Sequence, residues 1–173
     1  MHYTAVSENI GQDLKGAQQM ALGKKTLQFI EHKFYNYKKI KVAIAEARAE
    51  QDAKGGTTGG NGHSRVSDPT AAVAIKHATP LACVTIKDGL FDRKIYQPEK
   101  WLEIMDYTFS MYGDRLEAAM AKRRYWKQES PDFTADNMGI CKATYYVWRE
   151  DFLSHAAYFA AGAGLIDPWK TME

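Results

Sequence analysis

The sequence predicts a mainly α-helical protein: a helical bundle with a long N-terminal helix, a small β-hairpin and a C-terminal helix-turn-helix. Three observations lead to this fold class. Apolar residues recur at every third or fourth position over long stretches, which is typical of amphipathic helices. One short β-rich stretch contains an Asp-Gly pair, a common tight-turn sequence. Near the C-terminus, small and bulky residues follow one another in the order that a helix-turn-helix requires.

Length and composition are those of a globular protein. The chain has 173 residues, of which 45% are hydrophobic and 25% charged, as in ordinary globular domains. Lys and Arg number 23 against 21 Asp and Glu, so the net charge indicates little. The basic residues are nevertheless concentrated in two blocks, 24–48 and 115–127. Such blocks favour a surface that meets a polyanion, although solvated helix faces give the same pattern.

The cysteines and the apolar runs indicate the compartment. Cys83 and Cys141 are the only cysteines, too few for a disulfide scaffold and consistent with a reducing environment. The first residues lack the basic-then-apolar pattern of a signal peptide. No apolar run reaches the roughly 18 residues that a membrane helix requires. We therefore expect a cytoplasmic protein with no membrane partner.

The first expected element is one long helix over residues 24–53. Its apolar stripe consists of Leu27, Ile30, Phe34, Tyr37, Ile40, Ile44 and Ala47. The stripe predicts packing against the rest of the chain or against a second copy in a homo-oligomer. The lysines that we expect mostly off the stripe are Lys33, Lys38, Lys39 and Lys41. A second interpretation is that the opposite side of the same helix forms a basic face that lies along nucleic acid.

A glycine-rich stretch ends this helix. Five glycines lie between Gly55 and Gly62, which predicts a flexible linker. A phosphate-binding P-loop is excluded, because it needs Lys and then Ser or Thr after its last glycine, whereas His63 follows Gly62. A second helix is expected to restart with Asp68 as its cap and Pro69 in the first helical position.

A hairpin and two further helices follow. The β-rich runs on either side of Asp88-Gly89 predict the hairpin. Pro98 begins a helix that ends at Gly113, and another helix begins at Leu116. The residues expected on the buried side of the first are Trp101, Ile104, Met105 and Thr108 or Phe109. Those expected inside on the second are Leu116, Met120 and Tyr125 or Trp126, with Lys122, Arg123, Arg124 and Lys127 outside.

The helix-turn-helix is predicted over residues 131–153. Ser130 caps its first helix, ahead of a proline in the first helical position. Ala135 is small enough for two helices to approach closely, and Gly139 can adopt the positive φ that the turn needs. The bulky residues that pack beneath the angle are Met138, Ile140, Tyr145 and Trp148.

With Tyr145 and Trp148 facing inward, the opposite face of the second helix is free to read a DNA major groove. The residues of this face are Lys142, Ala143, Tyr146, Val147 and Glu150. Lysine can donate to guanine or to a phosphate, Ala and Val can contact a thymine methyl group, and Glu can accept from cytosine. Tyr146 can bond a phosphate or a base edge. Phosphate contacts are expected from Arg149 and from Lys122, Arg123, Arg124 and Lys127.

Two plainer interpretations stay open at this point. The two helices can be ordinary bundle helices with an apolar seam. A helix-turn-helix can also be a protein–protein element that does not touch DNA.

The stretch from "PEKWLEIMDYTF" to "GICKATYYVWREDFLSHAAYFAAGAGLI" resembles the RinA-type late-transcription activators of phages and prophages. The long N-terminal helix, the Gly-rich break and the "SDPT" after it agree, so the resemblance covers about residues 25–166. The resemblance implies a helix-turn-helix similar to the promoter-reading C-terminal domain of sigma factors. It also implies binding of double-stranded DNA upstream of a late operon in a bacterial host, together with a contact to RNA polymerase.

By position, the resemblance assigns the DNA-reading helix to Lys142, Ala143, Thr144, Tyr146, Val147 and Arg149. One departure lies at Cys141, where such helices usually begin with serine or a similar capping residue. Because a thiol is a poor acceptor, the cap of this helix is expected to be weak or to come from another group.

The expected domain organisation follows these elements. It comprises an N-terminal helical segment (1–54), the Gly-rich linker (55–67), a helix with the hairpin (68–97), a helical DNA-binding domain (98–166) and a tail (167–173).

The sequence offers no pattern typical of an enzyme. The histidines are scattered, with no pair four residues apart: His2, His32, His63, His77 and His155. There is no CxxC pair for zinc and no G-x-S-x-G serine. We therefore expect no catalytic role, no cofactor and no metal. The alternatives to a transcription activator are a DNA-packaging subunit similar to a phage small terminase and a protein-interaction module.

Overall fold

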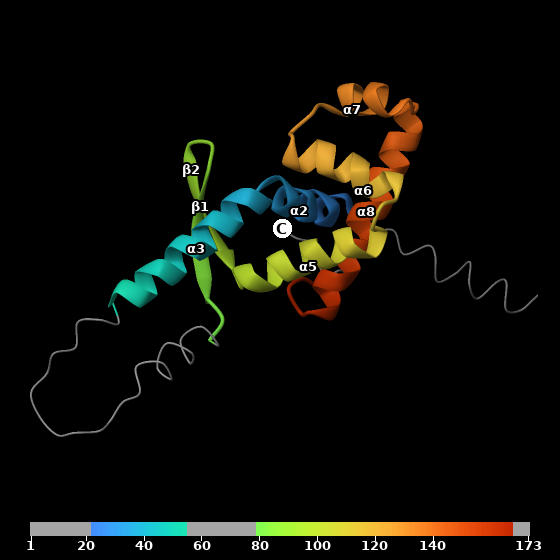
Figure 1. The fold of residues 1–173 in the computed structure, drawn as a ribbon. Helices are drawn as coiled ribbons and strands as arrows, with labels where there is room; N and C mark the ends of the chain where they lie inside the picture. The colour runs from blue at the N-terminus through green and yellow to red at the C-terminus, as the bar shows by residue number, and fades with distance from the viewer. Residues whose placement is uncertain (1–21, 55–78, 168–173) are drawn as a thin grey trace, which may run out of the picture.

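Helices dominate the part of the chain that the computed structural model describes, residues 22–54 and 79–167 (Figure 1). The elements are α2 (Lys24–Tyr35), α3 (Tyr37–Lys54), β1 (Cys83–Asp88), β2 (Phe91–Tyr96), α5 (Pro98–Tyr112), α6 (Leu116–Ala121), the π-helix η1 (Lys122–Trp126), α7 (Pro131–Met138) and α8 (Lys142–Gly162). The predicted fold class, mainly α with a small hairpin, is confirmed. The Gly-rich linker, the helix start at Asp68 and the tail after Asp167 lie outside the described residues. In the two described ranges, no helix is long and apolar enough to cross a membrane.

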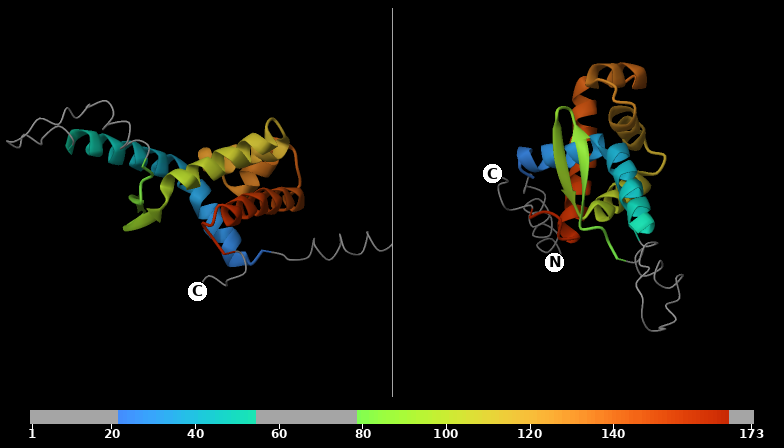
Figure 2. Two further views of the ribbon diagram at one scale, coloured as in Figure 1. Left: turned by 90° about the horizontal axis from the view of Figure 1, so that it is seen from below. Right: turned by 90° about the vertical axis from the view of Figure 1, so that its left-hand side faces the viewer.

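The arrangement places the hairpin and the predicted helix-turn-helix at opposite sides of the molecule. Helix α2 packs across α8, and α5 and α6 pack on α8 as well. Helix α3 leaves this group and lies against β1 and α5. In Figure 1 the hairpin stands beside α3, whereas α7 lies above α6, at the upper end of α8. In the left view of Figure 2 the green hairpin again lies on the side of the cyan α3 and away from the red α8.

The predicted N-terminal helix is divided in two at Asn36. The Asn36 backbone N–H donates to the carbonyls of His32 and Lys33, each at 3.2 Å. Its side-chain amide also donates to the His32 carbonyl, at 3.0 Å. A side chain that competes in this way for backbone acceptors favours a helix end. The expectation of one helix over 24–53 was therefore wrong, although Leu27, Ile30, Phe34 and Ile40 of its stripe are buried as predicted.

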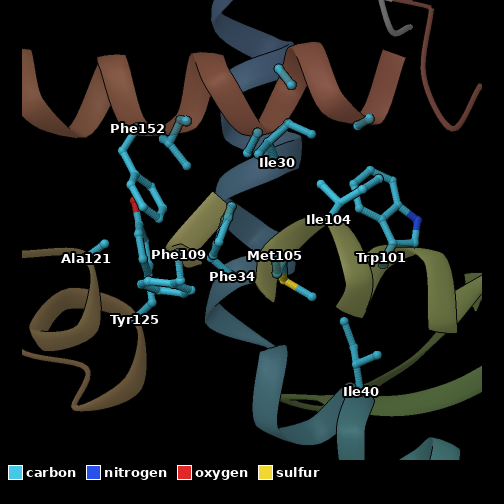
Figure 3. Packing of buried hydrophobic residues seen from close by; sticks show 14 of the residues in the cluster. Ile30, Phe34, Ile40, Trp101, Ile104, Met105, Phe109, Ala121, Tyr125 and Phe152 are labelled. Carbon is cyan, nitrogen blue, oxygen red and sulfur yellow. The ribbon is translucent and has the colours of Figure 1, made fainter. Parts of the chain in front are cut away.

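The aromatic side chains of four elements meet in the centre of the core (Figure 3). The ring of Phe34 in α2 lies 5.8 Å from Phe109 in α5, 5.4 Å from Tyr125 in η1 and 5.2 Å from Phe152 in α8, measured between ring centroids. Phe109 and Phe152 are themselves 5.2 Å apart. Offset and edge-on ring pairs at these separations add to the gain from burial. These four residues are the aromatic junction of the fold.

The stretch after α6 forms a π-helix that the sequence pattern did not predict. The Lys127 N–H donates to the Lys122 carbonyl at 3.3 Å, a hydrogen bond that spans five residues, as in a π-bulge. The wider turn allows two successive aromatic residues to face the core. Tyr125 is buried and Trp126 packs partly against the same cluster, so both of the predicted alternatives point inward. Leu116 does not: it is the first residue of α6 and stays exposed, because inward packing begins at Ala118.

The hairpin has the predicted position, with its turn one residue later than the Asp88-Gly89 pair. Asp88 is paired with Phe91 at the end of the ladder, so Gly89 and Leu90 form the loop. Gly89 has a φ of +65°, which glycine adopts readily. The Asp88 carboxylate then connects the hairpin to the helices, because His32 Nε2 lies 2.6 Å and Lys39 Nζ 3.8 Å from its oxygens.

We predict that Phe152→Ala lowers the free energy of unfolding by about 3–5 kcal/mol, because it opens a cavity among the other three rings of the aromatic junction. Chemical denaturation monitored by circular dichroism measures this loss. Phe133→Ala is the matched control, since Phe133 is 57% exposed and its truncation should change stability by no more than about 0.5 kcal/mol. Equal losses in the two variants would contradict the placement of the core.

Candidate nucleic-acid interface

Helix α7 begins and ends with the signals that the sequence predicted. The Ser130 hydroxyl accepts a hydrogen bond from the Phe133 N–H at 3.2 Å. At the other end Gly139 is left-handed, with φ 64° and ψ 31°. The N–H groups of Gly139 and Ile140 donate to the carbonyls of Asp136 and Ala135, both at 3.1 Å. This is the hydrogen-bond pattern of a Schellman motif, and it turns the chain sharply towards α8.

A small core of its own holds the angle between α7 and α8. Met120 of α6, Ala135 of α7 and Tyr145 of α8 are fully buried together. The residues packed against them are Met138, Ile140 and Trp148. All the predicted inward residues of the helix-turn-helix therefore lie in this cluster. Three short helical segments around one apolar cluster are the local architecture that a helix-turn-helix needs.

Cys141 occupies the N-cap position of α8, where the sequence predicted a weak cap. Among the described residues it accepts no capping hydrogen bond from the helix backbone. Its sulfur lies 3.1 Å from the Thr144 hydroxyl, and this contact lowers the pKa of the exposed thiol. Thr144 is thus half-buried and directed at the start of its own helix. Thr144, which the resemblance assigns to the DNA-reading helix, is thus less exposed than its neighbours Lys142 and Ala143.

The remaining face of α8 is accessible. The exposed residues are Lys142, Ala143, Tyr146, Val147 and Glu150, which are the five that the sequence predicted as the reading face. Tyr146 is 49% exposed and packs edge-on to Tyr145, with ring centroids 5.3 Å apart. The buried Tyr145 ring therefore supports one side of the exposed Tyr146 ring.

Arg149, which the sequence predicted as a phosphate contact, is engaged in an ion pair within the fold. Its Nε donates to Glu31 Oε1 at 2.7 Å and its Nη2 to Glu31 Oε2. The Tyr125 hydroxyl donates to the same carboxylate at 3.3 Å; burial raises the pKa of Tyr125 and keeps this hydroxyl protonated. The Glu31 side chain is 13% exposed. A bidentate pair in this setting is a structural contact between α2 and α8.

Sequence reasoning missed Glu31 because its partner is 118 positions away in the chain. A lone acid in a basic helix carries no local signal of such a pair. Only the crossing of α2 over α8, which places the two side chains together, reveals it.

The arginines of η1 are also engaged within the fold. Arg123 Nη1 lies 3.3 Å from both Glu129 carboxylate oxygens. Arg124 donates to the Glu129 carbonyl at 2.6 Å, and its guanidinium lies 4.9 Å from the centre of the Tyr35 ring. Lys122 and Lys127, in contrast, are exposed. The predicted basic cluster is therefore reduced to its two lysines.

Acidic residues border the reading face. Lys142 Nζ lies 2.9 Å from Asp132 Oδ1, and both side chains are well exposed. The hydrogen bond to Asp132 raises the pKa of Lys142, so this lysine remains charged. Asp136 is exposed on α7 as well. The face thus combines one paired cation, Lys142, with the acid Glu150 and with apolar and hydroxyl groups.

The described ranges contain no group of three or more His, Cys, Asp or Glu side chains placed to hold a metal ion. Comparison of the chain with protein-family models, with curated proteins and with solved structures finds no match. Support for a function therefore comes from the geometry and chemistry of the site and from the resemblance noted in the sequence.

We predict that Arg149→Ala lowers the free energy of unfolding by about 2 kcal/mol, because it leaves the Glu31 carboxylate partly buried without its cation. In a double-mutant cycle, Glu31→Ala combined with Arg149→Ala should lose less than the sum of the single variants. Arg115→Ala is the control, since Arg115 lies exposed with a 3.9 Å contact to Glu117. Strict additivity in the Glu31–Arg149 cycle would contradict a direct pair.

Proposed function

We propose that this protein binds double-stranded DNA with the N-terminal half of α8 in a major groove and activates transcription from a nearby promoter. As the resemblance to RinA-type activators suggests, the promoter would belong to phage or prophage late genes in the cytoplasm of a bacterial host. RNA polymerase would be contacted by a second surface.

The observation that carries the proposal is the division of α8 into a fixed side and an accessible side. Tyr145 and Trp148 pack into the small core, while Lys142, Ala143, Tyr146 and Val147 are exposed on the same two turns. The N-terminal part of a recognition helix meets base edges in this way. The capped start of α7, the left-handed Gly139 and the small core beside α8 agree with this arrangement.

The chemistry of the exposed side favours contacts to bases over contacts to phosphates. Ala143 and Val147 suit thymine methyl groups, and the Tyr146 hydroxyl can donate to a base edge or a phosphate. Since Arg123, Arg124 and Arg149 are paired internally, the phosphate contacts would come from lysines. This predicts modest affinity for random DNA and a stronger dependence on sequence.

We predict that Tyr146→Ala lowers affinity for a selected duplex about tenfold, because a base or backbone contact on the reading face is lost. The duplex is first obtained by selection from a random library, and binding is then measured by fluorescence anisotropy. Tyr158→Ala is the matched control: Tyr158 lies on the same helix and is 51% exposed, but it is remote from the proposed groove. The proposal fails if the two variants bind alike.

Salt dependence tests the phosphate contacts. With Lys122, Lys127 and Lys142 as the contacting cations, log K should fall against log salt with a slope of about −3 per protomer. Lys122→Gln and Lys127→Gln should each reduce the magnitude of this slope by about 1 and weaken binding to all DNA sequences equally. A steep slope that neither substitution changes would place the phosphate contacts on another surface.

A second candidate function is a protein-interaction module, and the apolar and acidic character of this end favours it. Phe133, Tyr146 and Val147 are large exposed apolar residues on α7 and α8, with Asp132 and Asp136 on α7. Acidic side chains repel a phosphate backbone but tolerate a basic protein partner. Selection from the library without enrichment of any sequence would favour this function over DNA binding.

A further inference from the structure

A cleft between α2 and the hairpin contains a lysine that the proposed DNA-binding function does not use. The cleft has a volume of about 570 Å³ and is lined by four residues of α2 and four of β2. Figure 1 shows that the hairpin, which forms one wall of this cleft, lies away from α7. The lining includes Lys33 and Phe29 from the helix and Arg93 and Lys94 from the strand.

Lys33 is a buried cation without an acidic partner. The residue is 6% exposed, in contrast to the expectation that it lies off the apolar stripe. Its ammonium group sits over aromatic rings, 4.5 Å from the centre of Phe29 and 5.1 Å from that of Trp101. Among the described residues, no carboxylate lies within ion-pair distance of it. Burial, with Arg93 nearby, lowers the pKa of Lys33 to about 8.

The acids nearby do not compensate this charge. Asp88 is occupied by His32 at 2.6 Å, by Arg93 Nε at 3.2 Å and by Lys39 at 3.8 Å. Asp92 lines the cleft but makes no ion pair with Lys33 among the described residues. The lining therefore has three cations, Lys33, Arg93 and Lys94, against this one carboxylate. Arg93 is paired with Asp88 and Lys94 is exposed, so Lys33 is the buried cation of the lining that has no carboxylate partner among the described residues. Because buried charges are normally paired, a bound anion would complete this site.

We propose that this cleft binds a phosphate group, with Lys33 at its base and Arg93 and Lys94 at its rim. The buried ammonium of Lys33 and the exposed cations of Arg93 and Lys94 give the cleft several charged donors, and a phosphate group can accept from several such donors at once. The phosphate can belong to a free phosphorylated small molecule or to the backbone of a DNA that also meets α8. The two aromatic rings hold the lysine chain in position before any anion arrives, so little ordering is required on binding.

Thermal denaturation with inorganic pyrophosphate at constant ionic strength tests the proposal on the full chain. The melting temperature should rise with pyrophosphate and saturate in the wild type and in Lys25→Met. Lys25 is an exposed lysine of the same helix and controls for the loss of charge. Lys33→Met should abolish the pyrophosphate effect, and its own melting temperature without ligand should lie a few degrees above that of the wild type, since an unpaired buried charge is removed.

Two further variants test the cleft independently of the buried lysine and of DNA binding at α8. Lys94→Met leaves the buried lysine in place and should reduce the apparent affinity for pyrophosphate about tenfold, which isothermal titration calorimetry measures. Tyr146→Ala should leave the pyrophosphate effect unchanged, so a failure of DNA binding at α8 is distinguished from a failure at the cleft. A pyrophosphate response that is equal in wild type, Lys25→Met and Lys33→Met, or absent from the wild type at millimolar concentration, would overturn the proposal.

A second experiment distinguishes a DNA backbone from a free phosphorylated molecule as the source of the phosphate. A short random duplex is titrated in place of pyrophosphate. If Lys33→Met weakens duplex binding and pyrophosphate competes with the duplex, the phosphate comes from a DNA backbone. If Lys33→Met leaves duplex binding unchanged while it abolishes the pyrophosphate effect, the cleft takes a free phosphorylated molecule.

Discussion

The crossing of α2 over α8 is the contact on which the other features of this structure depend. Phe34 of α2 meets Phe152 of α8 inside the aromatic junction, and Glu31, one turn earlier, pairs with Arg149. Three residues of α8 are fully buried alanines, Ala156, Ala157 and Ala160. Because their side chains are small, another helix can pack closely against α8. The N-terminal helix and residues 98–166 therefore share one core.

Helix α8 belongs to two apolar clusters at once. Its first turns contribute Tyr145 to the small core of the helix-turn-helix, and Phe152 and Leu153 begin its contribution to the main core. The helix runs without interruption from Lys142 to Gly162. The exposed side of its first half, which we propose as a DNA-reading face, is thus held in a fixed orientation by the second half and by α2. Rigid presentation of this kind keeps the entropic cost of binding low.

The sequence predicted the features that depend on near neighbours in the chain. The cap at Ser130, the left-handed Gly139 and the exposed side of α8 each follow from residues within one or two turns. It did not predict the helix break at Asn36, where a side-chain hydrogen bond competes with the backbone, or the π-turn before Lys127. It also missed the burial of Lys33 and the pairing of Arg149. Both depend on contacts between distant parts of the chain, that of Lys33 with the Trp101 ring and that of Arg149 with Glu31, and no local pattern encodes them.

The described arginines are paired within the fold, so the basic blocks of the sequence indicate less surface charge than their residue count suggests. Each arginine in the described ranges makes a hydrogen bond or ion pair within the fold; these residues are Arg48, Arg93, Arg115, Arg123, Arg124 and Arg149. The planar guanidinium suits such fixed, partly buried pairs, whereas the compact lysine ammonium prefers water. Surface charge near the helix-turn-helix is therefore supplied by lysines, and a count of basic residues overstates it. Lys33 is an exception, because it is a buried lysine. Among the described residues it has no carboxylate partner, and this feature marks the cleft between α2 and the hairpin.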